Sequence, residues 1–207
     1  MRAKSKGMPV FYLSLGGLFC ALFFLASNIL PPIAVIPGVP ITFQVLVVAM
    51  MAGLLGFKFG LTVLGTIFLM TAVGIPMMSG FSGGPAAFVK PTAGYIVGWL
   101  FIVLTVGLWR DKVEPKLAGR RHKGLLRVAG FMTAGILGVV LCYACGAAWL
   151  SLYNGIGLSG FWAGFLSNAV FFPVDVLKLA AAHLLCQAME RILRRLGVPS
   201  QPGYAKN

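Results

Sequence analysis

Residues 125–150 read LLRVAGFMTAGILGVVLCYACGAAWL, and this stretch decides the fold class. Its only charged residue is Arg127, which lies near its start. A helix needs about 20 consecutive apolar residues to cross the hydrocarbon core of a bilayer. The stretch meets this requirement, so it predicts a transmembrane helix.

The composition extends this prediction to the whole chain. Of the 207 residues, 59% are hydrophobic and only 10% are charged, and the mean hydropathy is +0.93. A soluble domain has about 25% charged residues, so this chain has too few polar groups to cover a water-facing surface. We therefore expect an all-α integral membrane protein whose residues 1–207 form a single transmembrane domain.

Further apolar runs predict a compact bundle of six transmembrane helices. The expected helices cover residues 9–30, 41–56, 59–76, 91–109, 125–150 and 162–196, and the last is expected to be interrupted or kinked near Pro173. Between them we expect a tight turn at 56–60 and loops at 31–40, 77–90, 110–124 and 151–161. The loop at 31–40 is proline-rich and apolar, and that at 77–90 is rich in glycine.

The basic residues predict the orientation of the bundle. Fifteen of the 17 Lys and Arg residues lie at the two termini, in the 56–60 turn or around segment 110–124, which leaves only Lys90 and Lys178 elsewhere. Loops rich in Lys and Arg stay in the cytoplasm, so we expect both termini to be cytoplasmic. The charge of +13 then reflects topology, and nucleic-acid binding is not expected.

Acidic residues are scarce, and one of them is unusual. Asp175 is the only one of the four acids that lies within an apolar run, and Lys178 follows it one helical turn later. Ionisable groups within a membrane face the bundle interior and have partners. The pair therefore either joins helices as a purely structural ion pair or lines a polar pocket open to the outside. Pro173 favours the pocket, because irregular backbone at membrane depth is tolerated where it lines a cavity.

The acidic, histidine and cysteine residues do not form a recognisable catalytic arrangement. An aspartyl protease needs two neighbouring carboxylates, and a serine hydrolase needs a base beside its nucleophile. His183 lies deep toward the expected cytoplasmic end, and His122 lies in the basic segment. Cys142 and Cys145 form a C-x-x-C without a second pair, so no zinc site is expected. We expect neither enzymatic activity nor a cofactor or metal.

Small residues recur at a spacing of four. Gly94/Gly98 and Gly130/Ala134/Gly138 indicate close packing of helices inside the bundle. Gly17 and Ala21 on the first helix have the same spacing. From spacing alone, they serve either internal packing or the docking of another membrane subunit.

Five motifs in this order resemble one known family: BioY, the biotin-specific substrate-capture (S) component of energy-coupling-factor transporters. The resemblance covers most of the chain and rests on Pro40-Ile41-Thr42-Phe43-Gln44, Gly74-Ile75-Pro76, Gly80-Phe81-Ser82-Gly83-Gly84, Pro91-Thr92-Ala93-Gly94-Tyr95-Ile96-Val97-Gly98 and Phe172-Pro173-Val174-Asp175-Val176-Leu177-Lys178. Ala93 and Val174 stand where this family often has glycine, but neither departure removes a polar group.

The resemblance implies a function and partners. The chain would capture biotin from outside the cell membrane and work with a membrane coupling subunit (T-component) and a pair of cytoplasmic ATPases. Asp175 and Lys178 would be the main ligand contacts, and Gly17 and Ala21 would form the docking face. The implied binding site also includes residues of the other motifs: Gln44, Thr92, Gly94 and Tyr95.

The chemistry of biotin agrees with these residues. Its ureido ring has two N–H donors and a carbonyl, which match the Asp175 acceptor and the Lys178 donor. The valerate carboxylate would point outward to Lys90 and to the backbone N–H groups of Gly83 and Gly84. Apolar side chains would hold the bicyclic ring, and the candidates are Phe43, Phe81 and Tyr95.

Three other functions remain compatible with the sequence. The first is an S-component for a different vitamin. The second is a stand-alone proton-coupled carrier with Asp175 as the proton site. The third is a membrane-assembly protein without a ligand. The vitamin that the purified protein binds distinguishes the first from biotin capture. Uptake that depends on the proton gradient distinguishes the second from an ATPase-driven transporter.

Overall fold

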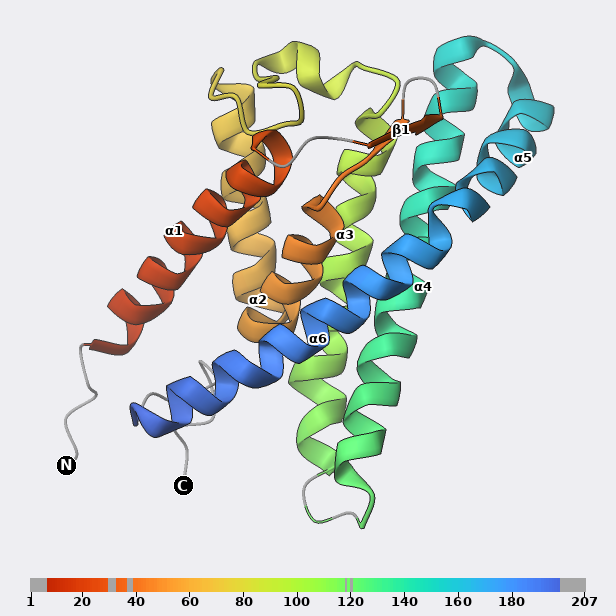
Figure 1. Cartoon of the computed structure of the whole chain (residues 1–207). Coiled ribbons are helices and arrows are strands. Elements are labelled where there is room, and N and C mark those ends of the chain that lie inside the picture. Colours follow the sequence, from red (N-terminus) through yellow and green to blue (C-terminus); the bar gives the residue numbers. More distant parts are fainter. Residues whose placement is uncertain (1–6, 30–32, 37–38, 118, 120, 198–207) are drawn as a thin grey trace.

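The computed structural model describes residues 7–29, 33–36, 39–117, 119 and 121–197. Six α-helices account for most of the chain (Figure 1). They are α1 (Gly7–Asn28), α2 (Gln44–Ala72), α3 (Ala93–Leu108), α4 (Lys123–Asn154), α5 (Gly157–Ser167) and α6 (Phe172–Arg195). Five of them, all except α5, are long and apolar enough to cross a membrane, counting α3 together with its continuation to Leu117. The predicted all-α membrane bundle is confirmed.

Helix α2 is a hairpin of two helical limbs. Gly56 has a φ of 75° and a ψ of −174°, which interrupts the helix, and the limbs on either side run back along each other (Figure 1). Gly60 consequently lies against the backbone of Ala52. The side chain of Asp111 accepts a hydrogen bond from the Phe57 N–H at 2.9 Å and fixes the turn. The hairpin agrees with the two short helices and the tight turn at 56–60 that the sequence predicts.

The sequence predicts a loop at 151–161 and a helix at 162–196 that is interrupted near Pro173; the structure has the interruption, but helix replaces most of the loop. Helix α4 continues to Asn154, and α5 begins only three residues later, after Gly155 in the left-handed conformation (φ 68°). The chain breaks at 168–171, and α6 begins with Pro173 in its first turn. Proline is tolerated there because the first N–H groups of a helix have no intrahelical acceptor. Gly155 ends α4, because glycine adopts the left-handed conformation of a helix C-terminus, but it does so four residues beyond the predicted end at residue 150.

The proline-rich segment 31–40 contains strands rather than only a loop. Strand β1 (Ile33–Ile36) pairs antiparallel with β2 (Val39–Ile41), with Ile33 opposite Ile41. Branched residues favour extended backbone. Pro40 is compatible with this pairing because a two-stranded sheet has only edge strands.

Helix α3 lies at the centre of the bundle, between α2 and α4, while α6 crosses α2 and α4 (Figure 1). Glycine allows α3 and α4 to approach closely. A Cβ on Gly98 would lie 2.8 Å from the Cα of Cys142, and one on Gly138 would lie 2.8 Å from the Cα of Ile102. The small-residue spacings on these helices therefore serve internal packing, as predicted.

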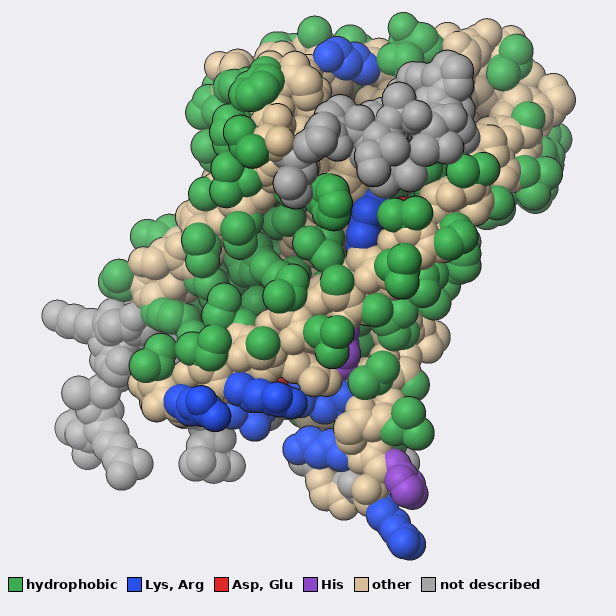
Figure 2. All heavy atoms as spheres, viewed as in Figure 1, with side chains coloured by type: hydrophobic (Ala, Val, Ile, Leu, Met, Phe, Trp, Pro, Cys, Tyr) green, Lys and Arg blue, Asp and Glu red, His purple; other side chains and the backbone are tan. Residues whose placement is uncertain are grey.

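Most Lys and Arg side chains visible in Figure 2 gather at one end of the molecule, whereas hydrophobic side chains cover its flanks. At this end, Glu114 and Glu190 face inward and pair with arginines. Glu190 accepts from Arg110 at 2.6 Å and from Arg127 at 2.8 Å, and Glu114 pairs with the same two arginines. These pairs join the end of α3, the start of α4 and the end of α6. The exposed surface of this end is consequently strongly cationic: Lys58, Lys112, Lys116, Arg121, Lys123, Arg191, Arg194 and Arg195.

The close α3–α4 contact predicts that Gly98→Ala destabilises the protein. The added methyl group meets the backbone of Cys142, so the helices must separate, at a cost of about 1–3 kcal/mol. Thermal unfolding in detergent should show a lower midpoint. Gly17→Ala is the matched control, because a Cβ there has open space around it. Equal midpoints for the two variants would contradict the packing.

Candidate functional site

A cavity opens between the start of α2, the segment 77–92, α3, α4 and the junction of α5 and α6. Its volume is about 840 Å³ when the open space at the mouth is included. The wall combines apolar side chains such as Trp99 and Phe171 with a few polar groups at fixed positions. It is a binding cavity by shape and composition.

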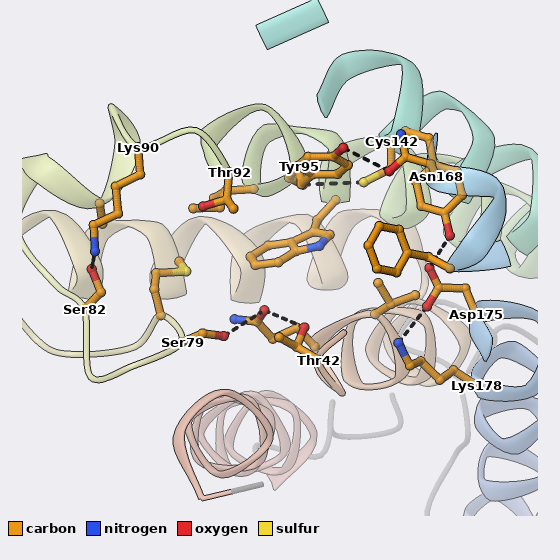
Figure 3. A pocket seen from close by; sticks show the side chains of 18 residues that line it. Thr42, Ser79, Ser82, Lys90, Thr92, Tyr95, Cys142, Asn168, Asp175 and Lys178 are labelled. Carbon is orange, nitrogen blue, oxygen red and sulfur yellow. Dashed lines mark hydrogen bonds and ion pairs between the residues drawn. The ribbon is translucent and has the colours of Figure 1, made fainter. Parts of the chain in front are cut away.

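The ion pair predicted from the sequence lies at one end of this cavity (Figure 3). The Lys178 Nζ is 2.7 Å from one carboxylate oxygen of Asp175, and the residues are only 7% and 4% exposed. Asp175 lies in the first turn of α6, where the helix dipole favours a negative charge. The pair thus faces the bundle interior, as predicted.

A third residue completes the pair. The hydroxyl of Tyr143 on α4 donates to the second carboxylate oxygen of Asp175 at 2.6 Å. Each oxygen therefore has one partner within the protein and keeps a further lone pair for a ligand. Sequence reasoning did not find Tyr143, because nothing in an apolar helix marks which of its residues meets a carboxylate 32 positions away.

Lys90 lies at the opposite end of the cavity from Asp175 and Lys178 (Figure 3). Its ammonium donates to the Ser82 hydroxyl at 2.7 Å, and its backbone carbonyl accepts from the Trp149 indole N–H at 2.8 Å. The side chain is exposed, as expected at a mouth. The cavity therefore has an exposed cation at one end and a buried ion pair at the other.

Gln44 lines the cavity but its amide is engaged by the protein. The amide nitrogen donates to the Ser27 hydroxyl at 2.9 Å, and the amide oxygen accepts from Thr42 at 2.8 Å and from Ser79 at 3.4 Å. Gln44 is therefore a builder of the cavity wall. It connects the end of α1, the start of α2 and the loop after α2.

Tyr95 and Thr92 also reach the cavity, as predicted. The Tyr95 hydroxyl donates to the side-chain oxygen of Asn168 at 2.9 Å, and Asn168 in turn donates to the carbonyl of Gly164. This chain joins α3 to the break between α5 and α6. Sequence reasoning missed Asn168, although an amide in an apolar run is the same kind of signal that identified Asp175.

The structure does not bring five predicted residues into the cavity wall: Phe43, Phe81, Gly83, Gly84 and Gly94. Gly94 packs against α4 beside Trp149, and a Cβ on Gly83 would meet the carbonyls of Gly74 and Ile75. The N–H of Gly84 donates to the Thr71 carbonyl at 2.7 Å. Gly83 and Gly94 are therefore required by close packing, whereas Gly84 is favoured by its positive φ of 77°. Phe43 and Phe81 are 37% and 58% exposed.

Gly17 and Ala21 lie on an outward face of α1, where both are exposed. A Cβ added to Gly17 would have no neighbour within 4 Å. The pair therefore does not mediate packing among the residues that the structure describes.

The site contains no ligand set for a metal ion. Within the described ranges, no group of three or more His, Cys, Asp or Glu side chains lies together. Cys142 reaches the cavity, but its thiol points to the Tyr95 carbonyl at 3.5 Å.

Comparison with known proteins gives a consistent result. The model of the BioY family matches residues 2–195. The biotin transporter BioY of Rhizobium etli is 36% identical over 196 residues, which cover 93% of this chain and 97% of the relative. That of Lactococcus lactis is 33% identical over 181 residues, 86% of this chain and 88% of the relative. A solved structure, the S-component for biotin from an ECF-type ABC transporter, is 27% identical and superimposes with a TM-score of 0.77 over 91% of this chain and 95% of its own.

The buried ion pair predicts an asymmetric response to substitution. Lys178→Met strands a buried carboxylate and should destabilise the protein by about 3 kcal/mol. The double variant Asp175→Asn/Lys178→Met removes both charges and should recover most of this loss. Thermal unfolding in detergent checks both. A Lys178→Met variant as stable as the wild type would show that the Lys178 ammonium does not stabilise the buried Asp175 carboxylate.

Proposed function

The chain belongs to the BioY family, and from this premise we propose that it is the S-component that captures biotin for an energy-coupling-factor transporter. It is a multi-pass membrane protein and a transport protein rather than an enzyme.

The observation that carries the proposal is the polar pattern of the cavity. The buried Asp175 and Lys178 lie at one end, the exposed Lys90 lies at the other, and a mainly apolar surface that includes Ile96, Trp99 and Phe171 lies between them (Figure 3). Biotin has the same order of groups: a ureido ring, an apolar thioether ring and chain, and a carboxylate. In this orientation Asp175 accepts a ureido N–H, Lys178 donates to the ureido carbonyl, and Lys90 pairs with the carboxylate.

The wall around this ligand differs from the one expected from the sequence. The predicted Tyr95 provides apolar surface together with Trp99 and Phe171, whereas Phe43 and Phe81 lie outside the cavity lining. Tyr143 holds the Asp175 carboxylate so that its remaining lone pairs face the ureido nitrogens. An oriented carboxylate improves binding because less conformational freedom is lost when the ligand arrives.

The proposed setting is the cell membrane, with both termini in the cytoplasm. The cationic end of the bundle supports this orientation, since loops rich in Lys and Arg remain inside. The cavity mouth and Lys90 then face outward. Energy for uptake would come from a T-component and cytoplasmic ATPases, and the exposed Gly17 and Ala21 on α1 offer the T-component a face for close helix contact.

Calorimetric titration of the purified protein with biotin tests the ligand. We expect tight binding by the wild type and a loss of about 100-fold or more in Asp175→Asn and in Lys178→Ala, because each leaves a buried polar partner unpaired. Leu177→Ala is the control, since that side chain is 69% exposed on the same helical turn.

Absence of biotin binding by a folded wild type would contradict the proposal, and a panel of other vitamins would then identify the ligand. Full affinity in Lys178→Ala would contradict the ureido contact alone. Uptake that follows the proton gradient and persists without the ATPases would favour a stand-alone carrier.

Lys90→Ala tests the orientation of the ligand. Since Lys90 is proposed to pair with the valerate carboxylate, its loss should weaken biotin by about tenfold and leave the neutral biotin amide nearly unchanged. Measuring the affinities of biotin and biotin amide for the wild type and for Lys90→Ala completes a thermodynamic cycle that isolates the contact between Lys90 and the carboxylate. An equal loss for the two ligands would place the carboxylate contact elsewhere.

A further inference from the structure

The last turn of α1 holds the glycine-rich loop after α2. The side-chain nitrogen of Asn28 donates to the Pro76 carbonyl at 3.0 Å, and its side-chain oxygen accepts from the Phe81 N–H at 2.6 Å. One amide therefore grips two points of the loop, one at its beginning and one at its tip. The Phe24 ring, one turn earlier on α1, packs edge-on against the Phe81 ring at 6.1 Å between centroids.

Phe81 has an unusual backbone at this contact. Its φ is +53°, and among the residues that the structure describes it is the only non-glycine with a positive φ. An aromatic residue in this conformation is strained, so the surrounding structure must hold it there. The ring is 58% exposed, so burial cannot account for the conformation. Two sets of polar contacts hold it: the bond from its N–H to Asn28 and the closed turn between residues 78 and 82.

The other side of the same loop forms part of the cavity wall. Residues 78 and 82 exchange two backbone hydrogen bonds, at 3.0 and 3.1 Å, which close the turn around Phe81. Ser79 and Ser82 of this turn line the cavity, and Ser82 accepts from Lys90. Because the turn is closed, the position of Phe81 fixes the positions of both serines and, through Ser82, of Lys90.

A second contact connects the same two elements from within. Ser27, the neighbour of Asn28 on α1, accepts from Gln44, and Gln44 accepts from Ser79 at 3.4 Å. That contact is longer and indirect, whereas the Asn28 bonds are short and direct. Asn28 is therefore the principal attachment of the loop to α1.

We propose that Asn28 is a positioning residue that clasps the loop 77–84 against α1 and so holds the outer wall of the cavity closed around its ligand. This role rests on the proposed function only for the identity of the ligand. When the clasp opens, Ser79 and Ser82 leave the cavity wall together, the Lys90 ammonium loses its Ser82 acceptor, and the ligand dissociates. Loss of the clasp therefore raises the dissociation rate far more than it lowers the association rate.

Hydrogen exchange of the ligand-free protein in detergent tests the clasp independently of biotin. Asn28→Ala should accelerate amide exchange in the segment 77–84 at least tenfold, with α3 unchanged. Leu25→Ala, an exposed position one turn earlier on the same helix, should stay within twofold of the wild type. Exchange in Asn28→Ala within twofold of the wild type would overturn the proposal.

Biotin kinetics on the same variants test the consequence for the ligand. In Asn28→Ala we expect dissociation to be at least tenfold faster and association to change less than threefold, with an unchanged thermal midpoint in the absence of ligand. Faster exchange of the loop with an unchanged dissociation rate would overturn the role in ligand retention. A wild type that binds no biotin contradicts the function proposed above, and the exchange experiment still decides whether Asn28 holds the loop.

Discussion

The buried ion pair of Asp175 and Lys178 is the constraint on which the site depends. A charge in an apolar bundle must be paired and hydrogen-bonded, and the two residues lie one turn apart at the start of α6, where the helix dipole favours the acid. This placement requires α6 to begin at membrane depth, and the break before Pro173 provides that start. Tyr143 on α4 then completes the hydrogen bonds of the carboxylate.

The cavity links this fixed end to a wall whose loop we propose to be adjustable. Close packing of α3 on α4 at Gly98 and Gly138 sets the positions of Tyr95, Trp99 and Tyr143 along one rigid wall. The opposite wall includes the loop 77–84, which hydrogen bonds from Asn28 join to α1. A binding site with one rigid wall and one hydrogen-bonded wall can release its ligand without unpacking the bundle.

The sequence predicted features that depend on neighbouring residues and missed those that depend on residues far away along the chain. Hydropathy located the membrane segments, and the scarcity of acids identified Asp175 and Lys178, because both signals are local. Tyr143, Asn168 and Asn28 were missed since their roles depend on partners between 32 and 73 positions away. A motif does not distinguish a glycine needed for backbone conformation from one that contacts a ligand, so the loop glycines were assigned to the site. The first residues of α5 were assigned to a loop, because glycine and serine there have weak helix propensity.

The most direct test of the central claim is a solid-state NMR distance between the ureido nitrogens of ¹⁵N-labelled biotin and the side-chain carboxyl carbons of ¹³C-labelled aspartate. The chain has only two aspartates, Asp111 and Asp175, so the labelled signals are easily separated. A ureido N–H donating to Asp175 predicts dipolar coupling at about 3.5–4 Å, the separation that an ordinary N–H···O bond implies. Bound biotin without coupling to Asp175 would contradict the account.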